Sequence, residues 1–470
     1  MGGGLLYVNA YFHRKEASMS PMGSPLSPAY QAAVDFLYRF IDNSRVRHPD
    51  QAAHFSLRRM KALLEHLGNP HRAYGVVHIT GTNGKGSVAA MLASILYAAG
   101  YRVGLYTSPH LVEFIERIRV NGQPIPPEQV AAGVERLRAW AEAHPDISTF
   151  ELTTGLAFHH FAQQHIDIAV VEVGLGGRYD ATNVVTPEVA VITAIDYDHT
   201  RLLGPTLAHI ARAKAGIIKP GRPVVTTRQP PEAMQVLRAV ARHRGARLWV
   251  AADQVHLQVL ADDLTGQRLR LAPRGNHARP CEVRLPLLGP YQRENAVVAY
   301  WTARVLRDRG WDLSPRALQH GLEQVRWPCR FEVLQADPPL VVDGAHTPAA
   351  ARALAAGMRH YFPARPWVLI FGVSRTKDPQ GLLRALAPRQ AHIIATQSIH
   401  PKAMPAAQVA AAARALGFPV TEAPTVEDAL AQALALRPPE GVILATGSLF
   451  VAAGVRVAFT GQPWWLASLV

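Results

Sequence analysis

The chain has 470 residues, of which 49% are apolar and 18% are charged, so it can bury a large core and is not a disordered chain. Its formal net charge is +14, and the arginines that supply most of this surplus are spread along the chain without a basic run, so we expect no nucleic-acid partner. Two cysteines cannot form a disulfide framework, and no apolar run approaches the ~20 residues that cross a bilayer, so we expect a cytoplasmic protein without membrane contact.

In chain order, residues 1–28 show no apolar period and predict a disordered leader. Residues 28–67 have apolar positions at helical spacing, and an alternation of strands and helices follows. Its predicted strands are 75–80, 102–106, 166–173 and 188–194, and its predicted helices are 88–99, 127–143 and 152–164. This order predicts parallel pairing in a doubly wound α/β sheet, whose ligands bind at the carboxyl ends of the strands.

Residues 247–287 have a different pattern, with short β segments between Asp-Asp, Arg-Gly-Asn and Pro turns that predict an antiparallel edge sheet. Helices are predicted again at 292–309 and 315–324, and Trp327-Pro328 is interpreted as a linker and hinge. A second alternation follows. Its predicted elements are 340–343, 348–361, 367–372, 392–396, 406–416 and 442–445. We therefore expect a mostly parallel P-loop domain over 29–326 and a smaller, Rossmann-like α/β domain over 327–470.

The sequence Thr80-Gly-Thr-Asn-Gly-Lys-Gly-Ser87 lies between a predicted strand and a predicted helix. Glycines let backbone N–H groups surround a phosphate, Lys85 can reach the terminal phosphates, and the Ser87 hydroxyl can bind Mg²⁺. It departs from the Walker A pattern, which requires Gly where Ile79 stands and Ser or Thr where Gly86 stands. The alternative is a glycine-rich turn without a ligand, which the Gly-Lys-Gly-Ser sequence at a helix start disfavours.

Two further motifs follow predicted strands of the first domain. Glu172 precedes a glycine-rich loop, and it is either a Mg²⁺ carboxylate or a strand-end acid satisfied by loop amides. His199, in Asp-Tyr-Asp-His-Thr, is either a metal ligand or a core histidine. Lys214 lies in a predicted helix, where a lysine is normally on the surface, but its place after a carboxylate–histidine pair suggests a role in the site.

The second domain has four motifs that follow or adjoin predicted strands. They are Arg330-Phe-Glu, Asp343-Gly-Ala-His346-Thr-Pro, Gly372-Val-Ser-Arg-Thr-Lys377-Asp and Thr446-Gly-Ser448. Each alone fits a turn or a helix cap, but the four together favour a shared cleft.

With these motifs in order, the chain resembles the folylpolyglutamate synthase/dihydrofolate synthase family of the Mur ligase superfamily. The resemblance runs from about Ala29 onward. It rests on HITGTNGKGSVAAML, YTSPHL, FELTT, EVGLGGRYDATN, DHTRLLGPTLAHIARAKAGIIKPG, YQRENA, CRFE, DGAHTP, GVSRTKD and TGSLF. It implies an ATP-dependent ligase of two domains that joins L-glutamate to the carboxylate of a folate or dihydropteroate through an acyl phosphate, and we expect a monomer.

The resemblance also implies roles for individual residues. Catalytic roles fall to Lys85, Lys214, His199 and His346, with Lys214 carbamylated. ATP contacts fall to Thr82, Asn83, Gly84, Lys85, Gly86, Ser87, Asn295, Arg330 and Asp343. Ligands of two Mg²⁺ ions would be Ser87, Ser108, Glu172, His199 and Lys214, and substrate contacts would be Asp180 and Ser448.

Two positions depart from the family pattern: Thr347 stands where Asn is usual, and Tyr291 where His is frequent. Both keep a hydrogen-bonding group, so we expect activity. Two other functions remain open, another Mur-type amino-acid ligase and a non-catalytic nucleotide-binding module. The missing UDP-binding leader domain disfavours the first, and the metal-ligand candidates Glu172, His199 and Lys214 disfavour the second.

Overall fold

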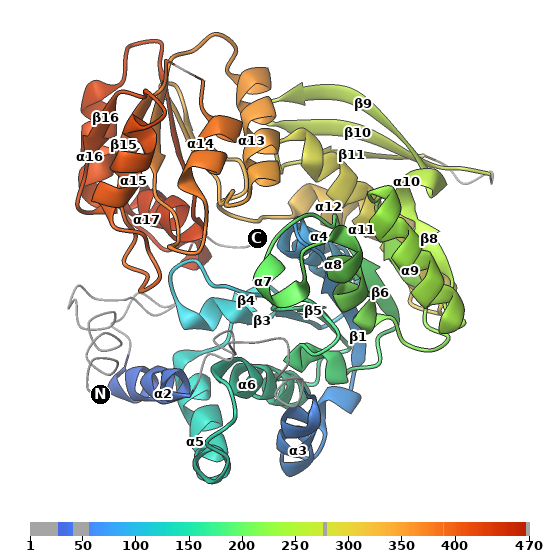
Figure 1. Ribbon diagram of the computed structural model, residues 1–470. Coiled ribbons are helices and arrows are strands. Elements are labelled where there is room, and N and C mark those ends of the chain that lie inside the picture. Colours follow the sequence, from blue (N-terminus) through green and yellow to red (C-terminus); the bar gives the residue numbers. More distant parts are fainter. Residues whose placement is uncertain (1–26, 41–55, 276–279, 389, 467–470) are drawn as a thin grey trace.

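A computed structural model describes residues 27–40, 56–275, 280–388 and 390–466 (Figure 1). Most of the predicted leader, residues 1–26, lies outside this part, and Ser27 and Pro28 already cap and begin a helix. Two helices, α2 (Pro28–Arg39) and α3 (Arg58–His66), lie in the stretch predicted to be helical, and residues 41–55 between them are outside the described part.

The first unit is built on an eight-stranded sheet of order β4-β3-β2-β5-β1-β6-β7-β8. The strands are β1 (Gly75–Thr80), β2 (Val103–Tyr106), β3 (Ile118–Val120), β4 (Gln123–Pro124), β5 (Ile168–Glu172), β6 (Val189–Ile192), β7 (Val224–Thr226) and β8 (Leu248–Val250). All pairs from β2 to β8 are parallel, and only β3 and β4, at one edge, are antiparallel. The predicted mostly parallel sheet is therefore confirmed.

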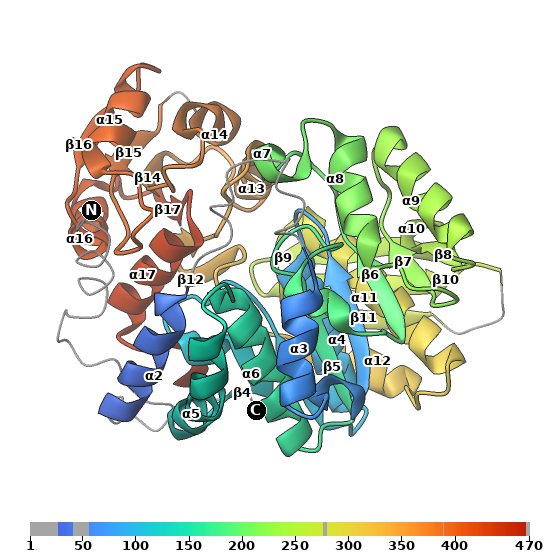
Figure 2. The same ribbon diagram turned by 60° about the horizontal axis from the view of Figure 1, so that its bottom comes forward.

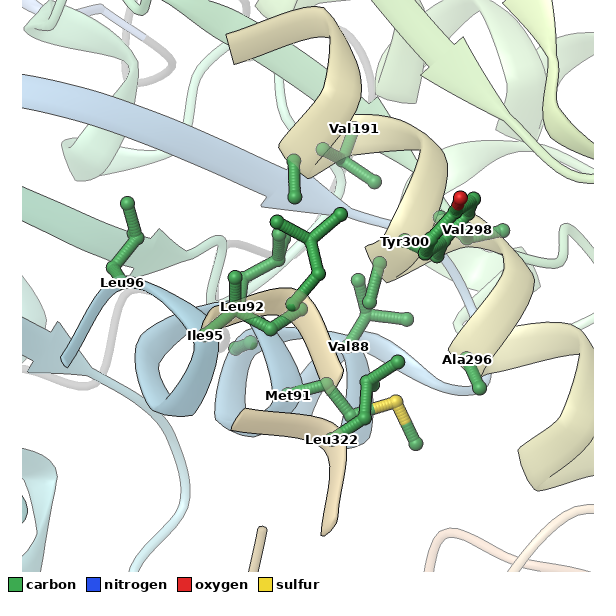
Figure 3. Packing of buried hydrophobic residues seen from close by; sticks show 14 of the residues in the cluster. Val88, Met91, Leu92, Ile95, Leu96, Val191, Ala296, Val298, Tyr300 and Leu322 are labelled. Carbon is green, nitrogen blue, oxygen red and sulfur yellow. The ribbon is translucent and has the colours of Figure 1, made fainter. Parts of the chain in front are cut away.

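Helices cover both faces of this sheet, as the doubly wound prediction requires (Figures 1 and 2). From α4 onward, the helices of this unit are α4 (Lys85–Ala98), α5 (Pro127–Ala143), α6 (Thr149–Gln163), α7 (Thr200–Leu203), α8 (Leu207–Lys214), α9 (Pro231–His243), α10 (Ala251–Gln254), α11 (Pro290–Asp308) and α12 (Pro315–Gln324). Side chains alternate along β1, where Val77 and Ile79 enter one core and Val76 enters the other. Figure 3 shows the first core, where Val88 and Leu92 of α4 lie among side chains of β6, α11 and α12.

The region predicted as an antiparallel edge sheet forms two separate structures. Leu248–Val250 is β8, which pairs in parallel with β7 in the main sheet, so the prediction is wrong there. β9 (Val255–Asp263), β10 (Gly266–Pro273) and β11 (Cys281–Leu285) form an independent antiparallel sheet of three strands. In Figure 1 this small sheet extends beside α13 (Pro348–Tyr361) of the second unit.

The second unit has a six-stranded sheet of order β12-β13-β17-β14-β15-β16, with only β12 antiparallel. Its strands are β12 (Glu332–Ala336), β13 (Pro339–Val342), β14 (Trp367–Phe371), β15 (His392–Ala395), β16 (Val420–Glu422) and β17 (Val442–Thr446). Its helices are α13 (Pro348–Tyr361), α14 (Pro379–Leu386), α15 (Ala406–Arg414), α16 (Val426–Leu436) and α17 (Leu449–Thr460). The predicted second βα alternation is confirmed, although β12, β16, α14, α16 and α17 were not predicted.

The two units meet through a polar cluster and through the segment after α17. The Asp262 carboxylate of β9 accepts a hydrogen bond from Tyr361 Oη of α13 at 2.5 Å and pairs with Arg293 of α11. Beyond α17, Trp464 and Trp465 pack into a core cluster of the first unit. None of the helices in the described ranges has the length and apolarity to span a membrane.

Candidate active site

The turn between β1 and α4 is fastened to the end of β6. The backbone N–H groups of Thr82 and Asn83 donate to the Ala194 carbonyl at 2.8 and 3.2 Å. Thr82 Oγ1 also donates to the carbonyl of Asp196 at 3.0 Å and accepts from its N–H at 3.1 Å. Gly84, just before the helix, has φ +87°, a left-handed conformation that glycine adopts without strain. The turn is therefore held in one shape at the carboxyl edge of the sheet.

Two glycines of this turn have neighbours that leave no space for a side chain. A Cβ atom at Gly84 would lie 2.5 Å from Asn295 Oδ1, and one at Gly86 would lie 2.9 Å from the indole of Trp327. A serine or threonine at position 86 would meet this ring, which explains the departure from the Walker A pattern at Gly86.

Two hydrogen-bonded side chains of α11 reach the same turn. Gln292 Nε2 donates to Ser87 Oγ at 3.2 Å, and Asn295 Nδ2 donates to Gln292 Oε1 at 2.9 Å. Gln292 is fully buried and was not among the predicted site residues, although it stands in the YQRENA motif. Its amide orients the hydroxyl that was predicted to bind Mg²⁺.

Lys85 and Glu172 face one another beside the turn. Lys85 Nζ donates to the Thr82 carbonyl at 3.3 Å and lies 3.9 Å from Glu172 Oε1. Glu172 is buried at the end of β5 and accepts one backbone bond, from the Ser108 N–H at 3.4 Å. Burial raises the pKa of the Glu172 carboxyl, and the Lys85 charge partly opposes that rise. The Ser108 N–H therefore takes one oxygen of Glu172, and the other oxygen faces the Lys85 ammonium group.

Lys214 is buried at the end of α8, not on the surface where a helical lysine is normally found. Its Nζ donates to the Gly81 carbonyl at 2.7 Å. Burial, with the nearby Lys85 charge second, lowers the pKa of Lys214 to about 7. Gly177 permits this placement, because a Cβ there would lie 3.0 Å from the Lys214 carbonyl. The amine is thus partly neutral at physiological pH.

His199 is not a core residue, because its side chain is 49% exposed. It has φ +50° just before α7, and its Nε2 lies 3.6 Å from Asp198 Oδ2. The other Asp198 oxygen pairs with Lys377 Nζ of the second unit at 2.7 Å. Burial alone would raise the pKa of Asp198, but His199 and Lys377 outweigh it and lower that pKa to about 2.

Asp343 and His346 follow β13 and have distinct surroundings. The two Asp343 oxygens accept from the N–H groups of Ala345 and Phe331, both at 2.7 Å, and from Tyr291 Oη at 3.3 Å. His346 Nδ1 lies 2.8 Å from the Gly344 carbonyl, which can only accept, so Nδ1 carries the proton. Burial, assisted by the Lys377 charge, lowers the pKa of His346 to about 4, so the ring is neutral with Nε2 as a base.

The remaining predicted residues have structural contacts. Asp180 is buried, and its oxygens accept from the N–H groups of Leu175 and Thr182 at 2.9 and 3.0 Å. Ser448 caps α17. Arg330 donates from Nη1 to the Cys329 carbonyl at 3.0 Å. Donors from its own loop occupy both oxygens of Asp180, so neither oxygen is left for a substrate. The Ser448 hydroxyl only accepts in its cap, so it still has a proton to donate.

Comparison with known proteins places this site in a family. The model of the Mur ligase middle domain matches residues 79–303, and that of the Mur ligase glutamate ligase domain matches residues 329–449. A folylpolyglutamate synthase of Lacticaseibacillus casei is 36% identical over 86% of this chain and 94% of its own length. A dihydrofolate synthase/folylpolyglutamate synthase of Bacillus subtilis is 35% identical over 85% and 94%. The chain belongs to the folylpolyglutamate synthase/dihydrofolate synthase family.

Solved structures of this family have the same fold. The Mycobacterium tuberculosis folylpolyglutamate synthase complexed with ADP has a TM-score of 0.81 and 35% identity, covering 93% of this chain and 99% of that one. A complex of folylpolyglutamate synthase with AMPPCP and folate has a TM-score of 0.77 and 32% identity, covering 92% and 100%. As a member of this family of Mur ligases, the chain is an ATP-dependent ligase.

The oxygen donors beside the turn between β1 and α4 suit Mg²⁺. In the described part of the chain, no three His, Cys, Asp or Glu side chains gather closely enough to hold a metal by themselves. Mg²⁺ does not need such a group, because it usually keeps several waters and takes one or two carboxylates together with substrate phosphates. The buried Glu172 carboxylate and the oriented Ser87 hydroxyl are hard oxygen donors of this kind, so they fit the ion.

The two departures from the family pattern have local contacts. Thr347 caps α13 by accepting from the Ala350 N–H at 3.2 Å. Tyr291, at the start of α11, donates to Asp343 across the junction of the two units. Both replacements therefore form hydrogen bonds at element ends.

Proposed function

We propose that the chain joins L-glutamate to the carboxylate of a folate or dihydropteroate, with ATP converted to ADP and phosphate. Relatives that cover most of the chain are folylpolyglutamate and dihydrofolate synthases, and solved relatives hold ADP, AMPPCP and folate. The proposal extends to a cytoplasmic monomer with domains at 29–326 and 327–470.

The observation that carries the proposal is the meeting of Lys85, Lys214 and Glu172 at one turn. Lys85 and Lys214 donate to the adjacent carbonyls of Thr82 and Gly81, and Glu172 lies 3.9 Å from Lys85. A module that only binds a nucleotide needs neither a second lysine, buried as Lys214 is, nor the buried acid Glu172. This combination therefore supports phosphoryl transfer at this turn.

The chemistry follows from the poor reactivity of a carboxylate as an acyl donor. The substrate carboxylate attacks the γ-phosphate of ATP to give an acyl phosphate, and Lys85 counters the charge that develops on the transferred group. The amine of glutamate then attacks the acyl carbon, and phosphate leaves. We assign His346 to accept a proton from that amine at Nε2, since its ring is neutral and Nδ1 is held by Gly344.

Two Mg²⁺ ions complete the proposed site. Ser87, Ser108 and Glu172 would hold one, and Glu172, His199 and Lys214 the second. Bound Mg²⁺ would neutralise charge on the phosphates. We propose that Lys214 is carbamylated, because its pKa of about 7 leaves a neutral amine that can add to CO₂. The carbamate supplies two oxygens and removes a positive charge beside Lys85.

The other contacts of the proposal are assigned by position. The backbone from Thr82 to Ser87 would surround the phosphates, and Asn295 and Arg330 would contact the nucleotide. Asp343 would support the nucleotide site indirectly, through its hydrogen bonds with Tyr291 Oη and the Phe331 N–H. Ser448 is assigned to the amino-acid side and Asp180, through its loop, to the folate side.

The test measures phosphate release from ATP and glutamate by the purified chain, with dihydropteroate in one reaction and tetrahydrofolate in another. We expect release that depends on both substrates, together with a product heavier by one glutamate residue. Release with either acceptor alone separates the two activities. Nucleotide binding without release with any acceptor would contradict the proposal and favour a binding module, while release with a different acceptor would favour another Mur-type ligase.

A further inference from the structure

The guanidinium of Arg119, in β3, contacts two indole rings that come from distant parts of the chain. Its guanidinium carbon is 4.2 Å from the ring centre of Trp464 and 5.1 Å from that of Trp327. Trp464 belongs to the segment after α17 of the second unit, and Trp327 follows α12 at the end of the first. Such contacts between a cation and an aromatic face are attractive, more so when they are desolvated.

The cation in this stack is held in place. Arg119 is 5% exposed, and its Nε donates to the Glu116 carbonyl at 2.9 Å. A planar guanidinium can stack on an indole face, a geometry that the ammonium group of lysine does not provide.

The Trp464 ring is also fixed on its outer side. Its Nε1 donates to Glu116 Oε2 at 2.9 Å. The other oxygen of Glu116 accepts from the N–H groups of Val112 and Glu113, both at 2.7 Å, so the acceptor cannot swing away without losing them. Trp464 is therefore a rigid end of the stack.

The other indole, that of Trp327, lies against the phosphate-binding turn. A Cβ at Gly86 would be 2.9 Å from Trp327 Cζ2 and 3.0 Å from its Nε1, so the indole lies directly against the first turn of α4. Gly86 is the residue after Lys85. A shift of the Trp327 ring would free this turn and alter the position of the lysine.

We propose that Arg119 and Trp464 are positioning residues for nucleotide binding, which act through Trp327 on the turn at Gly86. The segment after the last helix of the second unit thereby supports the phosphate-binding turn of the first. This inference rests on the proposed function in assigning a nucleotide to that turn. Binding of AMPPCP can be measured without folate or glutamate, so it can be tested apart from the ligase reaction.

The experiment titrates AMPPCP with Mg²⁺ into the full chain by calorimetry. We expect Trp464→Ala to weaken binding about tenfold and Arg119→Lys to weaken it about fivefold. Trp464→Phe keeps a ring over Arg119, so its AMPPCP affinity should stay within about twofold of that of the original protein. In the ligase assay the same variants should raise KM for ATP more than they lower kcat.

The matched control is Trp465→Ala. Trp465 is as buried as Trp464, belongs to the same core and packs edge-on against Trp464 with 6.1 Å between ring centres, but its own ring is not the one that lies over Arg119. We expect a similar loss of thermal stability from Trp465→Ala with little change in AMPPCP affinity. Equal weakening by both alanine variants would show a merely structural effect and overturn the inference.

A second measurement keeps the inference testable if Trp464→Ala folds poorly. The variants Trp464→Leu, Arg119→Lys and Trp327→Phe each remove one member of the stack, and their effects on AMPPCP affinity are measured singly and in pairs. Residues in one stack should show non-additive effects, whereas additive effects would contradict coupling through Arg119. Tight AMPPCP binding that follows these expectations in a chain without ligation would refute the proposed function alone.

Discussion

Lys377 Nζ and Asp198 Oδ1 lie 2.7 Å apart, and this ion pair joins the loop after β14 in the second unit to the residue before His199 in the first. Both side chains are largely buried, so loss of Lys377 would leave the Asp198 carboxylate with His199 as its remaining ionisable partner. We therefore expect Lys377→Met to lower kcat at least about tenfold, because the ion pair that joins the second unit to the residue before His199 is lost. Direct ADP titration should show affinity within about threefold of the original.

Arg375 provides the control for this prediction. It lies on the same loop but donates within the second unit, from Nε to the Ala403 carbonyl at 2.9 Å. Arg375→Met should therefore leave kcat nearly unchanged. An equal loss in both variants would show that the loop as a whole, not the ion pair, matters.

Lys85→Ala should abolish ligation while the fold remains intact. The lysine contacts the Thr82 carbonyl and faces Glu172, and these contacts contribute little to packing. Phosphate release measures the first effect, and the thermal midpoint measures the second. Unchanged turnover at saturating ATP would remove Lys85 from the mechanism.

Glu172→Gln should raise the Mg²⁺ concentration that half-activates the enzyme, because an amide is a poorer Mg²⁺ ligand than a carboxylate. The change keeps the shape and the Ser108 contact. Activity is titrated with Mg²⁺ at fixed ATP in both proteins. If the two curves superimpose, Glu172 does not bind the metal.

Lys214→Ala should lose activity, and Lys214→Glu should recover part of it by placing a carboxylate nearby. The carbamate itself is observed by ¹³C NMR after addition of labelled bicarbonate, a signal that Lys214→Ala must lack. An unmodified lysine in a structure with Mg²⁺, nucleotide and bicarbonate would refute the modification. Carbamates are labile, so the metal and bicarbonate must both be present.

Glu113 gives a prediction about stability and pH. Burial raises the pKa of its carboxyl to about 8, and Tyr30 donates to it at 3.4 Å. Between the unfolded value of 4.5 and about 8 the folded state binds more protons than the unfolded state, so stability falls as pH rises through this range. Glu113→Gln should remove this pH dependence. The variant should therefore lose less stability than the original protein between pH 5 and pH 8. Denaturant midpoints at the two pH values measure it, and parallel pH curves would contradict it.

Local pattern predicted much of the fold. The bounds of α5, α12 and α13 agree with the predicted ranges, because their apolar spacing and proline starts are strong helix signals. The position of the glycine-rich turn between β1 and α4 was also predictable, since its glycines and lysine are contiguous between a strand and a helix. The split of 247–287 was not, because a short strand such as β8 is assigned by its neighbour β7 and not by its own residues.

Sequence motifs proposed the candidate site residues, but they did not predict how these residues are arranged. The burial of Lys214 depends on the close approach of Gly177, thirty-seven positions earlier in the chain. The contacts of Asp180 turn inward because its own loop supplies the donors. The Lys377–Asp198 pair joins two units that no local pattern relates.

The docking of Trp464 and Trp465 means that the polypeptide crosses between the units twice, once near residue 328 and once after α17. A unit held at two points can turn about the line that joins them, but it cannot swing away freely. A single proteolytic cut near residue 328 should therefore leave the two fragments associated. A recombinant first unit that stops at residue 326 would lack the two indoles that fill its core, so it should be less stable than the same unit mixed with the second fragment.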